Sequence, residues 1–562
     1  MLDRSFLRRV LLPGAGFFLL FGIASAQTPL IYSRSIYNAA SYTPAGLPGG
    51  GIAQGSLFSL FGTNLGPTAG VSVNAFPLQT TLGGTSISIV QGATTVAAIP
   101  VYVGASQINA IMPSNAPLGA ASVQITYNGH RSNFAPVRIV TTSFGVYTAL
   151  GTGLGPAIVQ NFINASTQPV NSTTAVAQPG QSATLWGTGL GPIQAADNIA
   201  PPVGNIPNIK VEVFVGGVSA PVLYSGRAPC CSGSDQVVFT IPTNAPTGCW
   251  VPIYVRTNGT AISNFVTMAI GPGASTCTTD VLPQITAGFI GAKSIGQAFT
   301  MRAATHHDVG VRSPIDTTAD YHVSFAFAPH DETFLFNPAI SFPPSGTCTV
   351  YTHQGDLLGG DMLPSMEPTT MPLDMGAPFL LTGPNGTKTL TSTFTGANAG
   401  YLGGAVSSLL SSTLFLDPGS YTVQGFGGLG VGPFTTNFTI PTPLNWTNRL
   451  TTTTVPRTQP LSVSWTGGDS GQVVAIVGFG EDLPTASSAV FACIAPKGAN
   501  SFTVPTDILA NLPATRPNPL QSKDIIYVLT LAGSSVETIN ATGLDVGLTS
   551  FFSILGKTVV LQ

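Results

Sequence analysis

Short runs of alternating apolar and polar residues, separated by glycine, proline and asparagine, make up most of this chain. In one such run, Phe58 and Leu60 would point to the same side of a strand. A similar run further on places Ala183 and Leu185 together, which makes Leu60 and Leu185 the expected core positions. No amphipathic stretch is long enough for a helix that covers a sheet. The pattern therefore predicts an all-β chain.

Turn residues separate these runs at regular places. The pairs Asn128-Gly129 and Asn258-Gly259 lie between alternating segments, which favours a two-residue hairpin turn at each of them. Position 64 is Asn and position 189 is Gly, and both residue types adopt a positive φ at low cost. We expect a left-handed turn residue at both positions.

Three sequence blocks occur twice in the same order, at offsets that grow from 125 to 131 residues. These are 55–67 and 180–192, 113–119 and 242–248, and 132–134 and 263–265. Ordered blocks with slowly growing offsets indicate two homologous modules. We take them as a first module, residues 27–142, and a second module, residues 143–279. Strands at this spacing predict tandem β-sandwiches.

The C-terminal region, residues 280–562, carries weaker strand patterns. Residues 417–423 are typical of a turn that enters a strand, and residues 460–465 and 472–478 predict two strands around a turn. A Gly-, Pro- and Met-rich segment, 357–378, predicts a long loop. We expect two further β-rich regions, 280–440 and 441–562, the latter Ig-like.

The first 26 residues predict a secretory signal peptide. A basic start with Arg4, Arg8 and Arg9 precedes an apolar run, 10–23, and small residues end at Ala26. The apolar run is shorter than the roughly 20 residues that a spanning helix needs. We therefore expect export, cleavage before Gln27 and no membrane span afterwards, so that the protein is secreted or lies at the cell surface.

Charge is scarce along the chain. Only 7% of its 562 residues are charged, against roughly 25% in an average soluble domain. The net charge is −3 and basic residues form no cluster, which argues against a nucleic-acid partner. An extracellular or cell-surface protein or polysaccharide is the expected partner, and no cofactor is expected.

The residues of the modules resemble a known family. The segment Gly62-Thr63-Asn64-Leu65-Gly66-Pro67, with 37–41 and 106–110, resembles the IPT/TIG branch of immunoglobulin-like domains. The pair is more closely similar to a duplicated module of uncharacterised bacterial secreted proteins. This resemblance covers about residues 35–272 and implies Ig-like sandwiches. Such domains serve as spacers, adhesins and enzyme appendages, so it implies no single function.

All six cysteines follow the signal peptide, as expected for disulfides in an oxidising compartment. Cys230 and Cys231 lie on a seven-residue insert that the first module lacks. Because a bond between adjacent cysteines would form a small strained ring, we expect one of them to pair with Cys249 and the other with Cys277. In the C-terminal region we expect Cys348 to pair with Cys493. The spacing of the cysteines does not match a thiolate zinc site.

Two patterns raise the question of catalysis or metal binding. The segment Gly468-Asp-Ser-Gly471 matches the nucleophile signature of chymotrypsin-like proteases, but it lies between two alternating runs and favours a plain turn. A cluster of histidines with nearby carboxylates could ligate a transition metal or calcium, although the spacings favour solvated loops. The candidate ligands are His306, His307, Asp308, His322, His330 and His353.

Four tryptophans could stack on sugar rings if they lined one face of the molecule. They are Trp186, Trp250, Trp446 and Trp465. Core packing is the commoner role of such residues in β domains. The sequence therefore predicts a non-catalytic protein for adhesion, scaffolding or ligand binding. The alternatives are a carbohydrate-binding protein, and an enzyme (a hydrolase, for example) or metal-binding protein with its site in 280–440.

Overall fold

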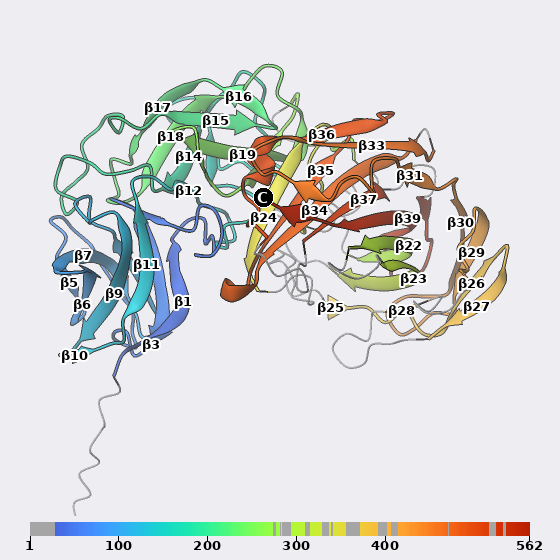
Figure 1. Ribbon diagram of the computed structural model, residues 1–562, viewed down its shortest axis with the longest axis horizontal. Helices are drawn as coiled ribbons and strands as arrows, with labels where there is room; N and C mark the ends of the chain where they lie inside the picture. The colour runs from blue at the N-terminus through green and yellow to red at the C-terminus, as the bar shows by residue number, and fades with distance from the viewer. Residues whose placement is uncertain are drawn as a thin grey trace, which may run out of the picture.

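Strands dominate the computed structural model of the protein (Figure 1), and the predicted all-β class is confirmed. The structure describes residues 28–273, 277–281, 283, 294–308, 315–328, 336–338, 341–355, 371–391, 402–405, 414–469, 471–515, 524–531 and 536–562. The expected signal peptide and most of the expected loop over 357–378 lie outside these ranges. Within them, no helix has the length and apolar character needed to cross a membrane.

The first module is a two-layered β-sandwich in which β7 takes part in both layers. One half of β7 pairs with β6 and the other half with β8. Phe58, Leu60, Ile87 and Ile89 fill the space between the layers. Its strands are β1 (Leu30–Asn38), β2 (Ile52–Ala53), β3 (Leu57–Thr63), β4 (Val71–Ser72), β5 (Thr81–Leu82), β6 (Thr85–Gln91), β7 (Thr94–Val103), β8 (Gln107–Ile111), β9 (Gly119–Tyr127), β10 (His130–Arg131) and β11 (Ala135–Val140).

The second module packs two five-stranded sheets face to face. One has the order β12-β14-β18-β17 with β13 beside β14, and the other has the order β16-β15-β19-β20 with β21 beside β19. Leu185 is fully buried between them, as Leu60 is in the first module, so the expected core positions are confirmed. The strands are β12 (Gly145–Val146), β13 (Val159–Asn161), β14 (Ser182–Thr188), β15 (Val211–Val215), β16 (Val218–Ala220), β17 (Val222–Arg227), β18 (Asp235–Thr240), β19 (Gly248–Thr257), β20 (Ala261–Ile262) and β21 (Val266–Ile270).

The predicted turn residues adopt the expected backbone conformation. Both residues of each Asn-Gly pair have a positive φ, 47° and 85° in the first module and 50° and 75° in the second. This is the requirement of a type I′ turn, which joins β9 to β10 and β19 to β20. Asn64 and Gly189 also have positive φ values, 55° and 107°. The left-handed turn residues are confirmed, and so is the two-residue loop of the first module, where Tyr127 pairs with His130. The two-residue loop predicted for the second module is wrong, because three residues, 258–260, separate Thr257 from its partner Ala261.

A ten-stranded sheet organises the C-terminal region (Figure 1). Its order is β24-β35-β34-β37-β39-β22-β23-β25, with β28 beside β23 and β38 beside β39. The elements are β22 (Ile295–His307), β23 (Ile315–Ala328), β24 (Cys348–Gln354), β25 (Met371–Pro372), β26 (Phe379–Gly383), β27 (Gly386–Leu390), β28 (Leu402–Ala405), β29 (Gly419–Gly425), β30 (Phe434–Ile440), β31 (Leu444–Trp446), β32 (Thr454–Val455), β33 (Leu461–Gly467), β34 (Val473–Asp482), η2 (Leu483–Thr485), β35 (Ser487–Ile494), β36 (Ser501–Val504), α2 (Thr506–Leu509), β37 (Ile525–Leu531), β38 (Glu537–Thr538), β39 (Val546–Thr558) and β40 (Val560–Leu561).

This sheet contains strands from both sides of residue 440. β22 pairs in parallel with β39, and β24 pairs with β35. The division expected near residue 440 therefore passes through one continuous sheet and does not separate two sheets. Local strand patterns could not show this, because the pairing joins segments that are far apart in the sequence. A four-stranded sheet, β27-β26-β29-β30, packs against the β22–β39 part through buried aromatic residues.

The disulfides follow the expectation in one case and correct it in another. Cys348 and Cys493 lie directly opposite each other on β24 and β35 and are bonded, as predicted. The pairing predicted for the second module is wrong, because Cys230 is bonded to Cys231 and Cys249 to Cys277. The physical reason is that the insert lies against the first module, away from Cys249. Its Gly233 lies against Leu57 of the first module, while Cys249 is buried beside Trp250 in another cluster.

A buried ion pair joins the two modules at this insert. The side chains of Arg227 and Asp235 contact each other and are 2% and 0% exposed. The Nη2 of Arg227 also donates to the carbonyl oxygens of Gly191 and Gly55, each at 2.7 Å, and Gly55 belongs to the first module. Asp235 accepts hydrogen bonds from the N–H groups of Gly189 and Leu190. Both buried charges are therefore satisfied, and one of them reaches across the junction.

Polar contacts to Asp507, beside an aromatic stack within the second module, join that module to the C-terminal region. The ring of Tyr254 lies 4.8 Å from that of Phe214 and 4.4 Å from that of Phe265. The Tyr254 hydroxyl donates to Asp507 of α2 at 2.8 Å, and Arg256 pairs with the same carboxylate at 2.9 Å. Burial raises the pKa of Tyr254, so the hydroxyl stays protonated and continues to donate. Three parts of the chain thus form one connected body.

The substitution Arg227→Met should destabilise the protein by about 3–5 kcal/mol, because it leaves the Asp235 carboxylate buried without a cation. Urea unfolding followed by circular dichroism would measure this loss. The matched control is Lys210→Met, which breaks an ion pair with Glu212 whose lysine side chain is 71% exposed. An exposed pair contributes about 0–1 kcal/mol. Equal losses in the two variants would contradict a special role of the buried pair.

Candidate functional site

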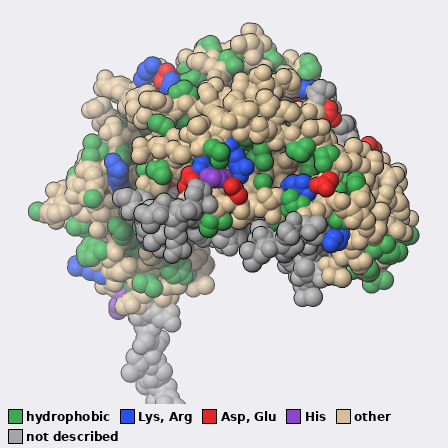
Figure 2. Space-filling model, turned by 45° about the vertical axis from the view of Figure 1, so that its right-hand side comes forward, with side chains coloured by type: hydrophobic (Ala, Val, Ile, Leu, Met, Phe, Trp, Pro, Cys, Tyr) green, Lys and Arg blue, Asp and Glu red, His purple; other side chains and the backbone are tan. Residues whose placement is uncertain are grey.

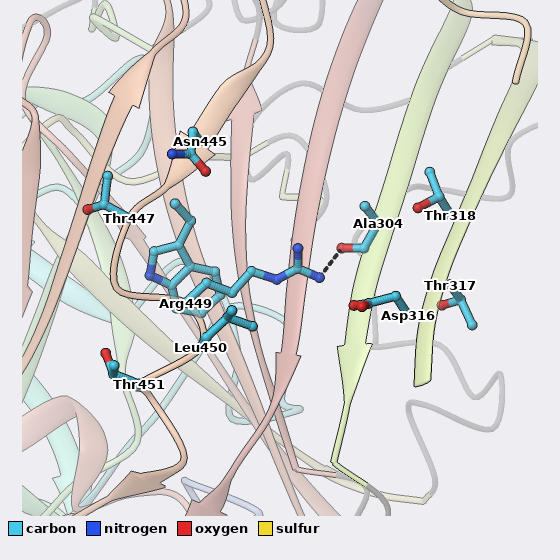
Figure 3. Close-up of a pocket in the computed structure, with 10 residues that line it drawn as sticks. Ala304, Asp316, Thr317, Thr318, Asn445, Thr447, Arg449, Leu450 and Thr451 are labelled. Atoms are coloured by element: carbon cyan, nitrogen blue, oxygen red, sulfur yellow. Dashed lines mark hydrogen bonds between the residues drawn. The ribbon is translucent and has the colours of Figure 1, made fainter. Parts of the chain in front are cut away.

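An open cleft of about 460 Å³ lies in the C-terminal region, between β31 with its following turn and the strands β22 and β23 (Figure 3). Its lining is rich in threonine and holds one cation and one carboxylate. The residues are Ala304, Asp316, Thr317, Thr318, Asn445, Trp446, Thr447, Arg449, Leu450 and Thr451. The cleft therefore offers mostly neutral hydrogen-bonding groups.

Packing of Trp446 fixes one wall of the cleft. Its side chain is 2% exposed and lies opposite Trp465 in the β31–β33 ladder. The indole Nε1 donates to Asn448 at 2.8 Å, and the N–H of Thr452 donates to the Asn448 carbonyl at 3.2 Å. The turn after β31 is thereby held in place. Alternation along β31 leaves the Asn445 side chain exposed next to the buried indole.

Arg449 extends across the floor of the cleft (Figure 3). Its Nε donates to the Gly556 carbonyl at 3.0 Å and its Nη2 to the Ala304 carbonyl at 3.1 Å. Within the described part of the chain, no carboxylate forms an ion pair with this guanidinium. Burial lowers the pKa of Arg449, and the nearby Asp316 opposes that shift. An arginine still keeps its charge at neutral pH, so the cleft presents a cation that only backbone carbonyls hold.

The remaining polar groups of the cleft differ in their availability. Thr447 is already hydrogen-bonded to Ser464, at 3.0 Å to its carbonyl and 2.8 Å to its hydroxyl. The side chains of Thr318 and Asn445 make no hydrogen bond in the described part of the chain. Leu450 is 65% exposed at the rim and adds an apolar surface. The cleft can therefore donate to and accept from a polar ligand and pair with an anionic group.

A histidine and two carboxylates adjoin the cleft at the end of β22. The His306 Nδ1 is 2.8 Å from Asp316, and its Nε2 is 3.2 Å from Asp308. Asp308 also contacts Lys557, whose side chain is 1% exposed. Figure 2 shows a histidine with acidic and basic side chains next to it near the middle of one face. Both ring nitrogens of His306 are therefore occupied by its protein neighbours.

The five predicted metal ligands that lie in the described ranges do not gather at one place. His307 is 3.3 Å from the Thr317 hydroxyl, and burial together with the charge of His306 lowers its pKa. His322 lies in the interior, and His353 lies on β24, five strands away from β22 in the sheet order. His330 lies outside the described residues. Among the side chains that are described, no group of three or more His, Cys, Asp or Glu has an arrangement that could hold a metal ion.

The four tryptophans do not form the sugar-stacking surface considered above. Trp250, Trp446 and Trp465 are 2%, 2% and 4% exposed, so none of them presents a ring face to a ligand. Trp186 is half-buried, and its Nε1 donates to Gln160 at 2.8 Å. The expectation of core packing holds for the three buried rings, because adjacent sheets cover them.

The protease-like segment is a turn. Gly467 and Gly468 have positive φ values, and the N–H of Gln472 donates to the Asp469 carbonyl at 3.0 Å. The turn joins β33 to β34, which belong to different sheets and do not pair as a hairpin. Ser470 lies outside the described residues.

The sequence patterns did not point to Arg449, Asn445 or Thr318. The available indication was compositional, because Arg449 lies in the run Thr447–Thr454, in which threonine recurs and no other charge occurs. Its two carbonyl partners come from β22 and β39. A contact between segments so far apart leaves no trace in a local pattern.

Comparison with known proteins gives only weak likenesses to solved structures. No family model matches the chain, and no curated protein matches it. The solved γ-CGTase of alkalophilic Bacillus clarkii is 10% identical with a TM-score of 0.16, and the match covers 52% of this chain and 38% of that one. SGBP-B of the Bacteroides ovatus mixed-linkage glucan utilization locus, solved with a mixed-linkage heptasaccharide, is 11% identical with a TM-score of 0.13. That match covers 86% of this chain and 93% of SGBP-B. Domains 5–6 of the S-layer protein SbsC are 10% identical with a TM-score of 0.17, and the match covers 43% of this chain and 98% of that structure.

Lowering the pH from 6.5 to 5 should cost about 2 kcal/mol of folding stability through His322. Its ring lies between the hydroxyls of Thr300 and Ser324 at 2.9 and 2.7 Å, and burial lowers its pKa from 6.5 to about 4. The unfolded chain takes up the proton first. Stability is therefore complete above the unfolded pKa and falls as the pH drops toward the folded value.

Urea unfolding at pH 6.5 and 5 would test this for the wild type and His322→Gln. The variant should lose less stability between the two pH values. His130→Gln, at an exposed position of β10, is the control and should behave as the wild type does. An unchanged pH dependence in His322→Gln would contradict the assignment.

Proposed function

We propose that the protein is an exported, non-catalytic surface protein that binds an acidic polysaccharide in the cleft around Arg449. The observation that carries this proposal is a guanidinium that forms no ion pair with any carboxylate of the described residues and is surrounded by hydroxyl and amide groups. An arginine with a free side can pair with a carboxylate or sulfate of a sugar. Thr318 and Asn445 supply neutral groups for the hydroxyls.

The charge balance of the cleft favours an acidic chain over a basic one. Asp316, the carboxylate among the lining residues, is bonded to His306 at 2.8 Å. No carboxylate in the described part of the chain forms an ion pair with the Arg449 cation. A ligand whose sugars carry carboxylates would place one of these groups at Arg449 and its hydroxyls toward the opposite wall. The exposed Leu450 side chain offers an apolar surface to a sugar ring.

The connected architecture supports a role as a fixed scaffold for this cleft. Arg227 joins the two modules through Gly55, and the bonds of Tyr254 and Arg256 to Asp507 join the second module to the C-terminal region. Disulfides and low charge suit a protein that works outside the cell. Two β-sandwich modules joined in this way would hold the cleft at a defined distance from a surface.

Adhesion to a protein is the second candidate function. In the second module, a hollow of about 670 Å³ is lined in part by Phe162 and Ile163, which are 44% and 54% exposed. Exposed apolar side chains that gather at one place are typical of protein contact sites. This surface is separate from the Arg449 cleft, so the two functions can be tested independently.

Arg449→Gln should weaken binding of a uronic-acid polysaccharide at least tenfold, because it removes the uncompensated cation. Isothermal titration calorimetry with alginate, and with dextran as the neutral comparison, would measure this on the mature 27–562 chain. Arg457→Gln is the matched control, since Arg457 is also half-buried and donates to a backbone carbonyl, that of Leu512, at 2.9 Å. It should bind as the wild type does.

Two results would count against the proposal. The first is an Arg449→Gln protein that binds alginate as the wild type does, with an unchanged circular dichroism spectrum. The second is a wild-type protein that binds alginate and dextran equally weakly. Asn445→Leu tests the neutral wall of the cleft and should lower the affinity for the same polysaccharide severalfold without a change of charge.

A further inference from the structure

The disulfide between Cys230 and Cys231 differs from the other two in its exposure. Both of its cysteines are exposed on the loop 228–234. In the other disulfides, Cys249, Cys348 and Cys493 are 3%, 8% and 0% exposed. A thiolate from solution must reach a sulfur atom to react with a disulfide. Cys277 is half-buried, and its partner Cys249 is buried. Cys230–Cys231 is therefore the one of the three disulfides in which both cysteines are exposed.

The loop that carries this disulfide connects the two charged partners of the buried ion pair. Arg227 ends β17 and Asp235 begins β18, with only residues 228–234 between them. Inside the loop, the N–H of Cys231 donates to the Ala228 carbonyl at 3.1 Å and that of Ser234 to the Cys231 carbonyl at 3.2 Å. A change of backbone geometry at the cysteines therefore occurs within a few residues of both Arg227 and Asp235.

The same loop touches the first module directly. The Gly233 carbonyl accepts a hydrogen bond from the Thr188 hydroxyl, which in turn accepts from the N–H of Leu57 at 2.8 Å. A Cβ added at Gly233 would come within 2.9 Å of Leu57 and 3.1 Å of Ile111. The position of the loop is therefore coupled to the position of the first module.

Chain entropy does not explain why the two adjacent cysteines are bonded. A disulfide stabilises a fold mainly by closing a long loop in the unfolded chain, and the effect grows with loop length. The bond between Cys230 and Cys231 encloses a single peptide group, whereas Cys348 and Cys493 are 145 residues apart. What the small ring does restrict is the backbone of the loop, since the peptide bond between the cysteines is part of the ring.

We propose that Cys230–Cys231 is a thiol–disulfide exchange site that controls how firmly the two modules are joined. A thiolate of an external dithiol attacks the sulfur of one cysteine, and the other cysteine leaves as a thiolate that takes up a proton. The second thiol of the reductant then attacks the mixed disulfide and frees the first cysteine. Two electrons pass from the dithiol, which becomes a disulfide, to the cysteine pair. The opened loop holds Arg227 and Gly233 less tightly against the first module.

Mass spectrometry would test the exchange step on the intact, folded protein. A short treatment with dithiothreitol, followed by iodoacetamide under native conditions, should place two carbamidomethyl groups on Cys230 and Cys231. The other four cysteines should stay unmodified. If Cys230 and Cys231 were labelled only after denaturation, or only together with the buried disulfides, the proposal would be wrong.

Hydrogen–deuterium exchange would test the consequence for the junction. Exchange in the segments 54–57 and 188–191 should rise severalfold on reduction of the wild type. The Cys230→Ser, Cys231→Ser double variant should show the fast exchange without reductant and no further change with it. Exchange that stays the same on reduction of the wild type would refute control of the junction. Polysaccharide binding at Arg449 is unaffected by this outcome, so the two proposals fail independently.

Discussion

The burial of one guanidinium determines how the two modules fit together. Arg227 and Asp235 are withdrawn from water, and the loss of hydration of each charge is large unless hydrogen bonds replace it. The replacements come from three places, namely the partner charge, the turn after β14 and the Gly55 carbonyl of the first module. Moving the first module away would leave a buried N–H group without an acceptor. The need to provide hydrogen bonds for these buried charges therefore helps to fix the relative orientation of the modules.

Because charged residues are scarce in this chain, its few ion pairs are important contacts between separate elements. With only 7% charged residues, the surface cannot rely on networks of exposed ion pairs. Several of its buried or half-buried pairs instead join separate elements. Arg256 connects β19 to Asp507 of α2, and Lys557 connects β39 to Asp308 after β22. Arg449 differs from these residues, because its donors end on backbone carbonyls.

The sequence allowed the modules, their core positions and their turns to be predicted, because these depend on residues close together in the chain. Leu60, Leu185 and the two Asn-Gly pairs follow from local alternation and from backbone preferences. The C-terminal sheet did not follow, since the pairing of Ile295 with Val546 joins strands 251 residues apart. The site was missed for the same reason. Histidines attracted attention by their density in the sequence, whereas the cleft depends on an arginine that reaches two distant strands.

The parallel pairing of β22 with β39 also determines the order in which the chain can fold. β22 cannot acquire this neighbour until residues 546–558 have been synthesised, although both modules can complete their sandwiches much earlier. Until then, the edge of β22 presents unpaired N–H and C=O groups that could pair with another chain. The edge of β22 is therefore open to association with another chain until residues 546–558 are available.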